Sequence, residues 1–331
     1  MKKQLLALAV GSLVMLPTAA LADKGPTVYG KVNVSLENID DSAADNKTWK
    51  LQSNASRLGV KGALDLDVAQ LKAIYQAEFE ISVDDGDKGG QTFSQRNIFG
   101  GFQHDTLGTL IAGKFDTPMK SSQGKVDQFG DLRGDLSQIF AGDERVANII
   151  QYSTPTLADV LKVNLALIPG EQTANPDPDN GVADAVSSSV VFENDMFYGA
   201  LAYDSDIQTT LLDRGTKGKT KILRGAAMAK ISNFEVGALV QQAEDSDNSD
   251  LKDDSYLVSG AVKLDRLKLK AQYGIADTNT TDNSYKLLAV GADYKLAKNS
   301  KSYIYFSQLK NDNTGDDNNT FGIGFEHKFS M

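Results

Sequence analysis

The chain has no cysteine, only two histidines in 331 residues, and fewer basic than acidic side chains. The lack of cysteine excludes disulfide bonds, thiolate catalysis and cysteine-ligated metal sites. No segment beyond residue 22 has the ~18 consecutive apolar residues that a membrane-spanning helix needs. Lysine and arginine total 34 against 44 acidic residues, a net charge of −10. Because nucleic-acid binding depends on neutralising phosphates with basic groups, we expect no nucleic-acid partner.

The scarcity of histidine also argues against catalysis. A serine hydrolase needs a histidine base beside its serine. His104 falls beside a tight turn and His327 on the apolar face of a strand, where we expect neither to meet a nucleophile. No phosphate-binding loop, dinucleotide fingerprint or metalloprotease motif is present, and the acidic run Asp245–Asp250 lacks the glycine and glutamate of a calcium loop. We therefore predict no enzymatic activity, no cofactor and no metal site.

The N-terminal residues have the pattern of a secretory signal peptide. Two lysines precede an apolar stretch from Leu5 to Pro17, and Ala20–Ala22 forms a small-x-small cleavage site. This arrangement is typical of a segment that is removed on export. We predict that residues 1–22 are cleaved and that residues 23–331 form a single domain.

Apolar and polar residues alternate with a period of two along most of the remaining chain. Residues 28–37 set Val32, Val34 and Leu36 against Lys31, Asn33 and Glu37, and residues 71–81, 267–275 and 321–331 repeat the pattern. One such strand is the ordinary half-buried strand of a soluble sheet. Its recurrence from end to end, with so many charges on one face, is typical of a transmembrane barrel whose strands alternate between lipid and a wet interior.

The connectors alternate between tight turns and long acidic loops, as expected when turns lie at one rim of a barrel and loops at the other. Tight turns stand near residues 65–67, 105–108, 193–195, 232–233 and 265–266. Long loops cover residues 40–47, 82–91, 169–185, 205–220, 244–254, 277–283 and 311–319.

An antiparallel barrel with both ends at one rim needs an even number of strands. We predict an all-β fold, a 16-stranded antiparallel transmembrane β-barrel, with fourteen or eighteen strands as the alternatives. The strands are expected near 27–38, 48–64, 69–81, 92–103, 109–115, 145–154, 160–168, 186–192, 196–204, 221–231, 234–243, 255–264, 267–276, 284–294, 301–310 and 320–331. Segments 92–103 and 301–310 are the weakest, since they carry apolar residues on both faces.

A barrel of sixteen strands is too wide for its own side chains to fill, so water enters. One connector, residues 116–144, is much longer than the others, and a structureless loop of this length is usually functional. Its apolar side chains include Val126, Phe129, Leu132, Leu136, Ile139 and Phe140. Since these gain nothing in open solvent, we predict that this third external loop folds inward against the barrel wall.

Several segments resemble the general diffusion porins of Gram-negative bacteria. They are Tyr29–Lys31, Ser56–Gly62, Ala112–Pro118, Glu144–Pro155 and the alternating-phenylalanine ending Phe325–Phe329. The resemblance covers residues 23–331, and only the final Met331, where such chains usually end in phenylalanine, departs from it. It implies an outer-membrane homotrimer, set in lipid and lipopolysaccharide, that passively conducts ions and small hydrophilic solutes. Residues 83–90 would latch onto a neighbouring subunit.

The resemblance also implies a constriction where basic residues of the wall face acids of the inserted loop. Arg57 and Arg145 match the wall positions best, Lys31, Lys61 and Arg96 are their companions, and Asp127, Asp131 and Asp135 are the loop acids. Charges at such close quarters set ion preference. That preference stays open, because the chain is acidic while the wall cluster is basic. A substrate-specific outer-membrane channel is the alternative, and saturable conductance would distinguish it from general diffusion.

Overall fold

The computed structural model describes residues 25–84, 91–171 and 180–331. The expected signal peptide, residues 1–22, and most of the expected latch, residues 85–90, lie outside the described residues. The strands are β1 (Thr27–Asp41), β2 (Asn46–Ser53), β3 (Arg57–Asp65), β4 (Leu71–Ile81), β5 (Phe93–His104), β6 (Gly108–Asp116), β7 (Arg145–Ser153), β8 (Leu161–Ile168), β9 (Ala185–Glu193), β10 (Phe197–Thr209), β11 (Gly218–Ile231), β12 (Phe234–Asp245), β13 (Lys252–Leu264), β14 (Leu267–Thr278), β15 (Asn283–Ala297), β16 (Ser300–Asn311) and β17 (Asp317–Ser330). Between β6 and β7 lie a short helix, α1 (Pro118–Ser121), and a 3-10 turn at Leu136–Gln138.

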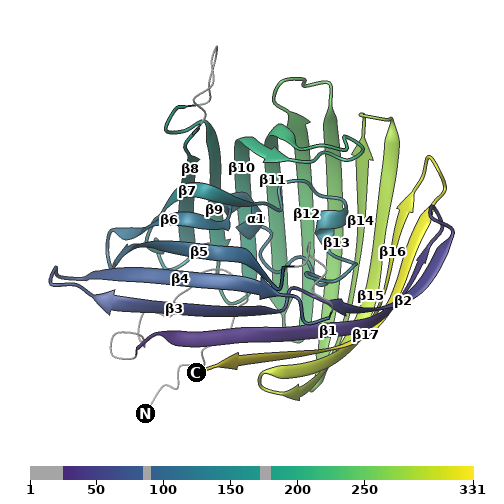
Figure 1. Cartoon of the computed structure of the whole chain (residues 1–331), viewed down its shortest axis with the longest axis horizontal. Helices are drawn as coiled ribbons and strands as arrows, with labels where there is room; N and C mark the ends of the chain where they lie inside the picture. Colours follow the sequence, from purple (N-terminus) through teal and green to yellow (C-terminus); the bar gives the residue numbers. More distant parts are fainter. Residues whose placement is uncertain (1–24, 85–90, 172–179) are drawn as a thin grey trace.

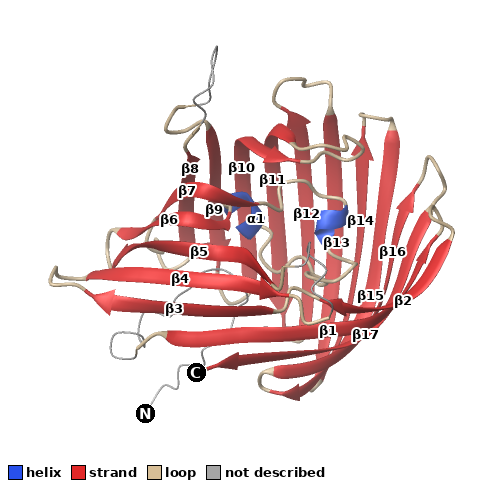
Figure 2. Ribbon diagram, viewed as in Figure 1, coloured by secondary structure: helices blue, strands red, loops and turns tan. Residues whose placement is uncertain are grey.

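All of these strands belong to one antiparallel sheet that closes on itself (Figures 1 and 2). β1 closes the barrel by pairing with β17 along almost its whole length. The seventeen segments of the described chain make sixteen barrel strands, because β2 and β3 pair in succession with β1. Only residues 54–56 separate these two segments, at the positive φ of 49° that Ala55 adopts. The predicted sixteen-stranded antiparallel barrel is confirmed.

The period-two pattern sets the two faces of the wall. In β1, Val32 and Leu36 are exposed on the outside, whereas Lys31 and Glu37 point inward and are buried. The outer surface is therefore apolar, as a face that meets lipid must be. No helix among the described residues is long and apolar enough to cross a membrane.

The connectors divide between the two rims as predicted, but some loops are shorter. The loop expected at 205–220 shrinks to residues 210–217, and the one expected at 244–254 shrinks to 246–251. The strands continue into these segments because backbone pairing extends to Thr209 with Gly218 and to Glu244 with Lys252. Polar residues typical of loops can thus form strand where the neighbouring strands supply hydrogen bonds to their backbone groups.

Aromatic rings cover glycines on neighbouring strands in several places. Directly paired examples are Tyr29 with Gly59, Tyr75 with Gly62, Tyr303 with Gly324, Tyr305 with Gly322 and Phe329 with Gly30. A glycine leaves a bare patch of backbone, and a cross-strand ring covers it. The pair of Phe329 and Gly30 lies on the seam where the last strand meets the first.

Candidate functional site

The connector between β6 and β7, residues 117–144, folds into the barrel. The six apolar side chains singled out from the sequence, Val126, Phe129, Leu132, Leu136, Ile139 and Phe140, are all buried. Val126, Leu136, Ile139 and Phe140 belong to a cluster with inward-facing residues of β9–β15. Phe129 and Leu132 pack against Tyr303 and Tyr305 of β16. The predicted inward fold of this constriction loop is confirmed.

Arg224 of β11 holds both arms of the constriction loop. Its side chain is fully buried and donates to the carbonyl oxygens of Met119, at 3.2 Å, and Ala141, at 2.7 Å. Its Nε also donates to Gln241 Oε1 at 2.7 Å. Sequence analysis missed this residue, because one arginine among many inward charges carries no signal that it meets a distant loop.

Uncharged side chains of the wall hold the middle of the constriction loop. Ser255 and Ser259 of β13 donate to the carbonyl oxygens of Ile139 and Val126. Gln272 of β14 donates to the carbonyl of Gly134 at 2.7 Å and accepts from the backbone of Gln128 at 2.8 Å. The polar inner face thus satisfies backbone groups of a loop that has little regular structure of its own.

Asp131 lies at the tip of the loop, where it reaches the opposite wall. Its Oδ2 accepts hydrogen bonds from Lys31 Nζ of β1 at 2.6 Å and from Arg57 Nη2 of β3 at 3.0 Å. Its backbone is left-handed, with φ of 68°, a conformation that aspartate tolerates better than most residues. The structure therefore brings three of the predicted charged residues together.

The wall beside this contact is a ladder of mixed charge. Arg57 Nη1 lies 3.7 Å from Glu78 Oε1, and Arg96 Nε donates to the same oxygen at 2.9 Å. Arg96 also donates to Glu80 at 3.2 Å. The carboxylates of Glu78 and Glu80 were not assigned to the site from sequence, and they offset much of the positive charge expected on the wall.

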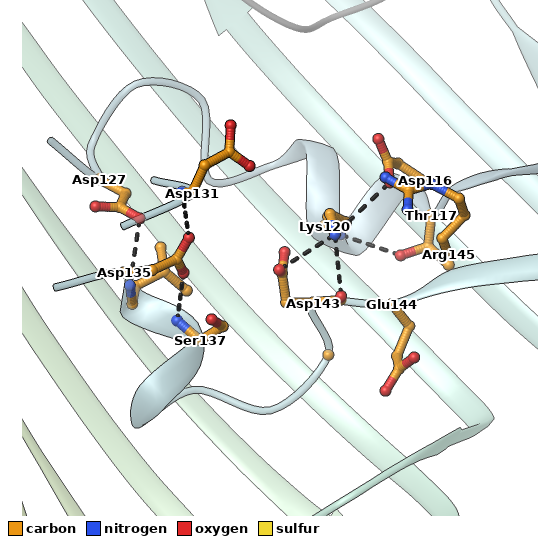
Figure 3. A network of polar contacts seen from close by, with 12 residues as sticks. Asp116, Thr117, Lys120, Asp127, Asp131, Asp135, Ser137, Asp143, Glu144 and Arg145 are labelled. Carbon is orange, nitrogen blue, oxygen red and sulfur yellow. Dashed lines mark hydrogen bonds and ion pairs between the residues drawn. The ribbon is translucent and has the colours of Figure 1, made fainter. Parts of the chain in front are cut away.

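Arg145 and Lys61 lie farther from the loop tip. Arg145 pairs with Asp116 at 2.8 Å at the root of the loop, where Lys120 bridges Asp116 and Asp143 (Figure 3). Lys61 Nζ lies 5.1 Å from the ring centre of Tyr29. Within the described chain, neither Arg145 nor Lys61 forms an ion pair with any of the three predicted loop aspartates.

Asp127 and Asp135 bind the backbone of their own loop. Asp127 accepts hydrogen bonds from the backbone amides of Phe129 and Leu136. Asp135 accepts from those of Ser137 and Asp131 (Figure 3). Both carboxylates thus shape the loop that carries Asp131. They do not reach the basic wall.

Asp135 and Asp131 also differ in how readily they ionise. Burial raises the pKa of Asp135, and the nearby Asp127 and Asp143 carboxylates add to that effect. Burial opposes ionisation of Asp131 as well, but Lys31 and Arg57 outweigh it and hold the pKa of Asp131 below its ordinary value. Asp131 is therefore held in its charged form by its two basic neighbours.

The two histidines form local contacts that include none of the charged site residues. His104 Nδ1 accepts from the backbone amides of Thr106 and Leu107 at a turn. His327 Nδ1 lies 2.7 Å from Ser300 Oγ, and the His327 ring stacks on the ring of Phe325. The serine contact of His327 was not expected, and it arises because β16 and β17 bring these residues into register. In the described part of the chain, no group of three or more potential metal ligands occurs.

The model of a protein family described as Gram-negative porin matches residues 7–314. The chain belongs to the Gram-negative porin family. Major outer membrane protein P.IB of Neisseria sicca is 27% identical over 375 residues, which cover 99% of this chain and 100% of that protein. The same protein of Neisseria gonorrhoeae is 24% identical over 366 residues, with 99% and 100% coverage.

Solved structures share the fold. The anion-selective porin from Comamonas acidovorans matches with a TM-score of 0.76 and 20% identity, over 92% of this chain and 99% of that one. The trimer form of in-vitro folded OmpT of Vibrio cholerae matches with a TM-score of 0.65 and 18% identity, over 92% and 99%. This porin is an outer-membrane diffusion channel, and its family is one of channels rather than enzymes.

Proposed function

We propose that ions and small hydrophilic solutes pass this porin beside the contact between the tip of its constriction loop and the wall strands β1 and β3, and that the charges there set ion preference. The observation that supports this proposal is the contact of Asp131 with both Lys31 and Arg57. Asp131 and Arg57 keep 33% and 18% of their side-chain surface exposed, so they remain in reach of passing ions. Arg96 and Arg145 extend the line of cations along the wall, whereas Lys61 is a more distant companion.

We propose general diffusion rather than a substrate-specific channel. The wall cations beside the loop tip are paired with Glu78 and Glu80, so no single solute charge is favoured strongly. A sugar-specific channel would need aromatic rings exposed to the lumen to bind its solute. Tyr303 and Tyr305 point inward, but the constriction loop covers them, so they cannot contact a sugar. Single-channel recording in planar bilayers tests the proposal. Conductance should rise linearly with salt, and saturation by one neutral solute would favour the specific channel.

We infer that the working form is a homotrimer. A trimer form of the similar OmpT of Vibrio cholerae has been solved, which supports this proposal. The exposed apolar outer wall also supports it, because this surface can pack against a second subunit as readily as against lipid. Chemical crosslinking of protein extracted in mild detergent should give a three-subunit species that disappears on boiling. A species that never exceeds one subunit would contradict it.

We further propose that residues 1–22 are removed on export and that lipopolysaccharide surrounds the rim formed by the loops. The lysine-led apolar N-terminus supports the first proposal. N-terminal sequencing of membrane-extracted protein should begin at Asp23, and an intact Met1 would contradict it. Lipopolysaccharide that copurifies through detergent exchange would support the second, and its complete loss would count against it.

A further inference from the structure

A cavity of about 530 Å³ lies inside the barrel on the turn side of the constriction loop. Its walls are inward-facing residues of β4–β8, its roof includes Asp116, Pro118 and Ser121 at the start of the loop, and residues 153–156 border its lower edge. The volume falls in the range of ~300–1,000 Å³ that is usual for small-molecule sites. A solute that passes the loop tip toward the turn rim therefore meets a chamber of ligand size.

One cation in this cavity has no partner. Lys162 lies at the start of β8 with its side chain among the lining residues. Within the described part of the chain, its ammonium group forms neither an ion pair nor a hydrogen bond. Most of the cations beside the loop tip, by contrast, are held by carboxylates, as Arg96 is by Glu78 and Glu80.

Besides Lys162, the lining of the cavity includes neutral hydrogen-bonding groups. Gln103, Gln151 and Asn164 line the cavity on β5, β7 and β8. Gln151 donates to Ser153 Oγ and Asn164 to Ser189 Oγ, and each amide nitrogen has a second hydrogen that these bonds do not use. The cavity therefore offers a positive charge together with neutral donors, which suits an anionic group.

The two acids of the cavity do not neutralise Lys162. Asp116 in the roof is bound to Arg145 at 2.8 Å and lies 3.7 Å from Lys120. Asp105 lies on the exposed turn at the rim. The charge of Lys162 is consequently left for a solute.

One sector of the lining is apolar. Ile74, Ile111 and Phe115 point inward, are almost completely buried, and belong to a cluster with Phe99 and Ile149. This sector departs from the charged inner face found elsewhere, and it gives a solute a surface against which apolar atoms leave water.

We propose that this cavity is a binding site for small organic anions, in which Lys162 and the amides hold a carboxylate while Ile74, Ile111 and Phe115 pack against its apolar body. The site rests on the proposed pore function, because a solute reaches it through the lumen. An anion held there occupies part of the path and lowers the current, so binding is visible as saturable block.

Benzoate is a suitable probe, and benzamide is its uncharged counterpart. Single-channel conductance in potassium chloride is recorded while each compound is added to the turn side of the bilayer. The wild type should show saturable block by benzoate and none by benzamide. Lys162→Gln should raise the half-blocking concentration roughly tenfold or more, the usual effect of losing a charge-assisted hydrogen bond. Lys162→Arg should retain block.

Lys263→Gln is the matched control. It removes a lysine near the same rim, but on β13, where Lys263 pairs with Glu235. Benzoate block should be unchanged in this variant. Equal block in wild type and Lys162→Gln, equal loss in Lys263→Gln, or equal block by benzamide would each overturn the site.

Single-channel recording in potassium chloride distinguishes failure of the proposed pore function from failure of the proposed anion site. If the wild type gives no current steps in potassium chloride, both the pore function and the site fail. If steps appear but benzoate never blocks them, only the site is wrong. Heat-dependent mobility in SDS shows whether each variant has folded, and Lys162→Arg supplies a folded reference if Lys162→Gln does not assemble.

Discussion

Asp131, at the tip of the constriction loop, accepts a 2.6 Å hydrogen bond from Lys31, which lies one hundred residues earlier on the first barrel strand. The same carboxylate oxygen accepts from Arg57 on β3. One acid thus joins the loop to two strands of the wall that it faces. The contact limits the width of the lumen at this height and places one negative and two positive charges beside the passing solute.

Replacing Asp131 by asparagine should shift selectivity toward anions. The change removes the negative charge but keeps the shape, so Lys31 and Arg57 lose their counter-charge. A single unit charge a few ångströms from a wet path changes ion energies by about 1 kcal/mol. We expect a roughly fivefold rise in the permeability ratio of chloride to potassium, measured from the reversal potential in a salt gradient.

Asp135→Asn is the control for this variant. Asp135 lies on the same loop, but it binds the amides of Ser137 and Asp131 and does not touch the wall. Its replacement should leave the permeability ratio close to that of the wild type. A shift as large as that of Asp131→Asn would mean that overall loop charge, and not the contact with Lys31 and Arg57, sets the preference.

The selectivity should also depend on pH in a predictable direction. Lys31 and Arg57 outweigh burial and lower the pKa of Asp131 below its ordinary 3.8. In the folded channel, the Asp131 carboxylate stays charged above this lowered pKa and is protonated only as pH falls through it. We expect a constant Asp131 contribution from neutral pH down to ~4.5, and its loss only in more acidic solution.

The difference between wild type and Asp131→Asn isolates the contribution of Asp131 to selectivity. Reversal potentials of both proteins are recorded from pH 7 downward, and their difference should stay level before it narrows below the ordinary aspartate pKa. A difference that already vanishes near pH 6 would show that Asp131 is not held in its charged form by its neighbours.

Removing the Arg224 clamp should free the constriction loop. Arg224→Met leaves the carbonyls of Met119 and Ala141 without their charged donor. Hydrogen bonds to charged groups contribute about 1.5–3 kcal/mol each. We expect a folded barrel whose open-channel current fluctuates more than that of the wild type, measured as excess noise in single-channel traces.

Lys221→Met, on the same strand, is the comparison. Lys221 lies three residues away near the loop rim. Within the described chain it does not hydrogen-bond to Met119 or Ala141, so its replacement should not raise the noise. Quiet traces from Arg224→Met would mean that the apolar packing of the loop is sufficient to hold it without the clamp.

Gly30→Val should weaken the seam of the barrel. A Cβ at Gly30 would come within 2.3 Å of the Phe329 ring and 2.7 Å of the backbone oxygen of Arg57. The ring can turn aside, but the backbone of β3 cannot, and overpacking of this kind costs about 1–3 kcal/mol. The temperature at which the folded band converts to the unfolded band in SDS should fall.

Gly199→Val tests whether that loss is local to the seam. Gly199 lies on β10, where an added Cβ has open space around it. Its conversion temperature should stay near that of the wild type. An equal fall in both variants would indicate a general sensitivity of strand glycines instead of a clash at the closing strands.

The sequence predicted the barrel because strand orientation is a local property. Alternation of period two tells each segment which face is apolar, and the even strand count follows from connectors that alternate in length. The weak alternation in segments 92–103 and 301–310 has a physical cause. Phe99, Tyr303 and Tyr305 are apolar residues that point inward, where a buried cluster or the constriction loop covers them.

The candidate site was only partly visible in the sequence. Family resemblance named Lys31, Arg57 and Asp131, and the structure brings them into contact. Asp127 and Asp135 instead accept hydrogen bonds from backbone amides of the loop. The clamp residue Arg224 and the unpaired Lys162 carry no local signal, because each looks like any other inward charge.

The sequence by itself determined which side chains face lipid and which face water, since that choice repeats every two residues along each strand. Only the tertiary structure decided which inward charges meet. Those meetings depend on strand register around the closed barrel and on the path of a loop whose contacts lie about a hundred residues away, and neither is encoded in the spacing of neighbouring residues.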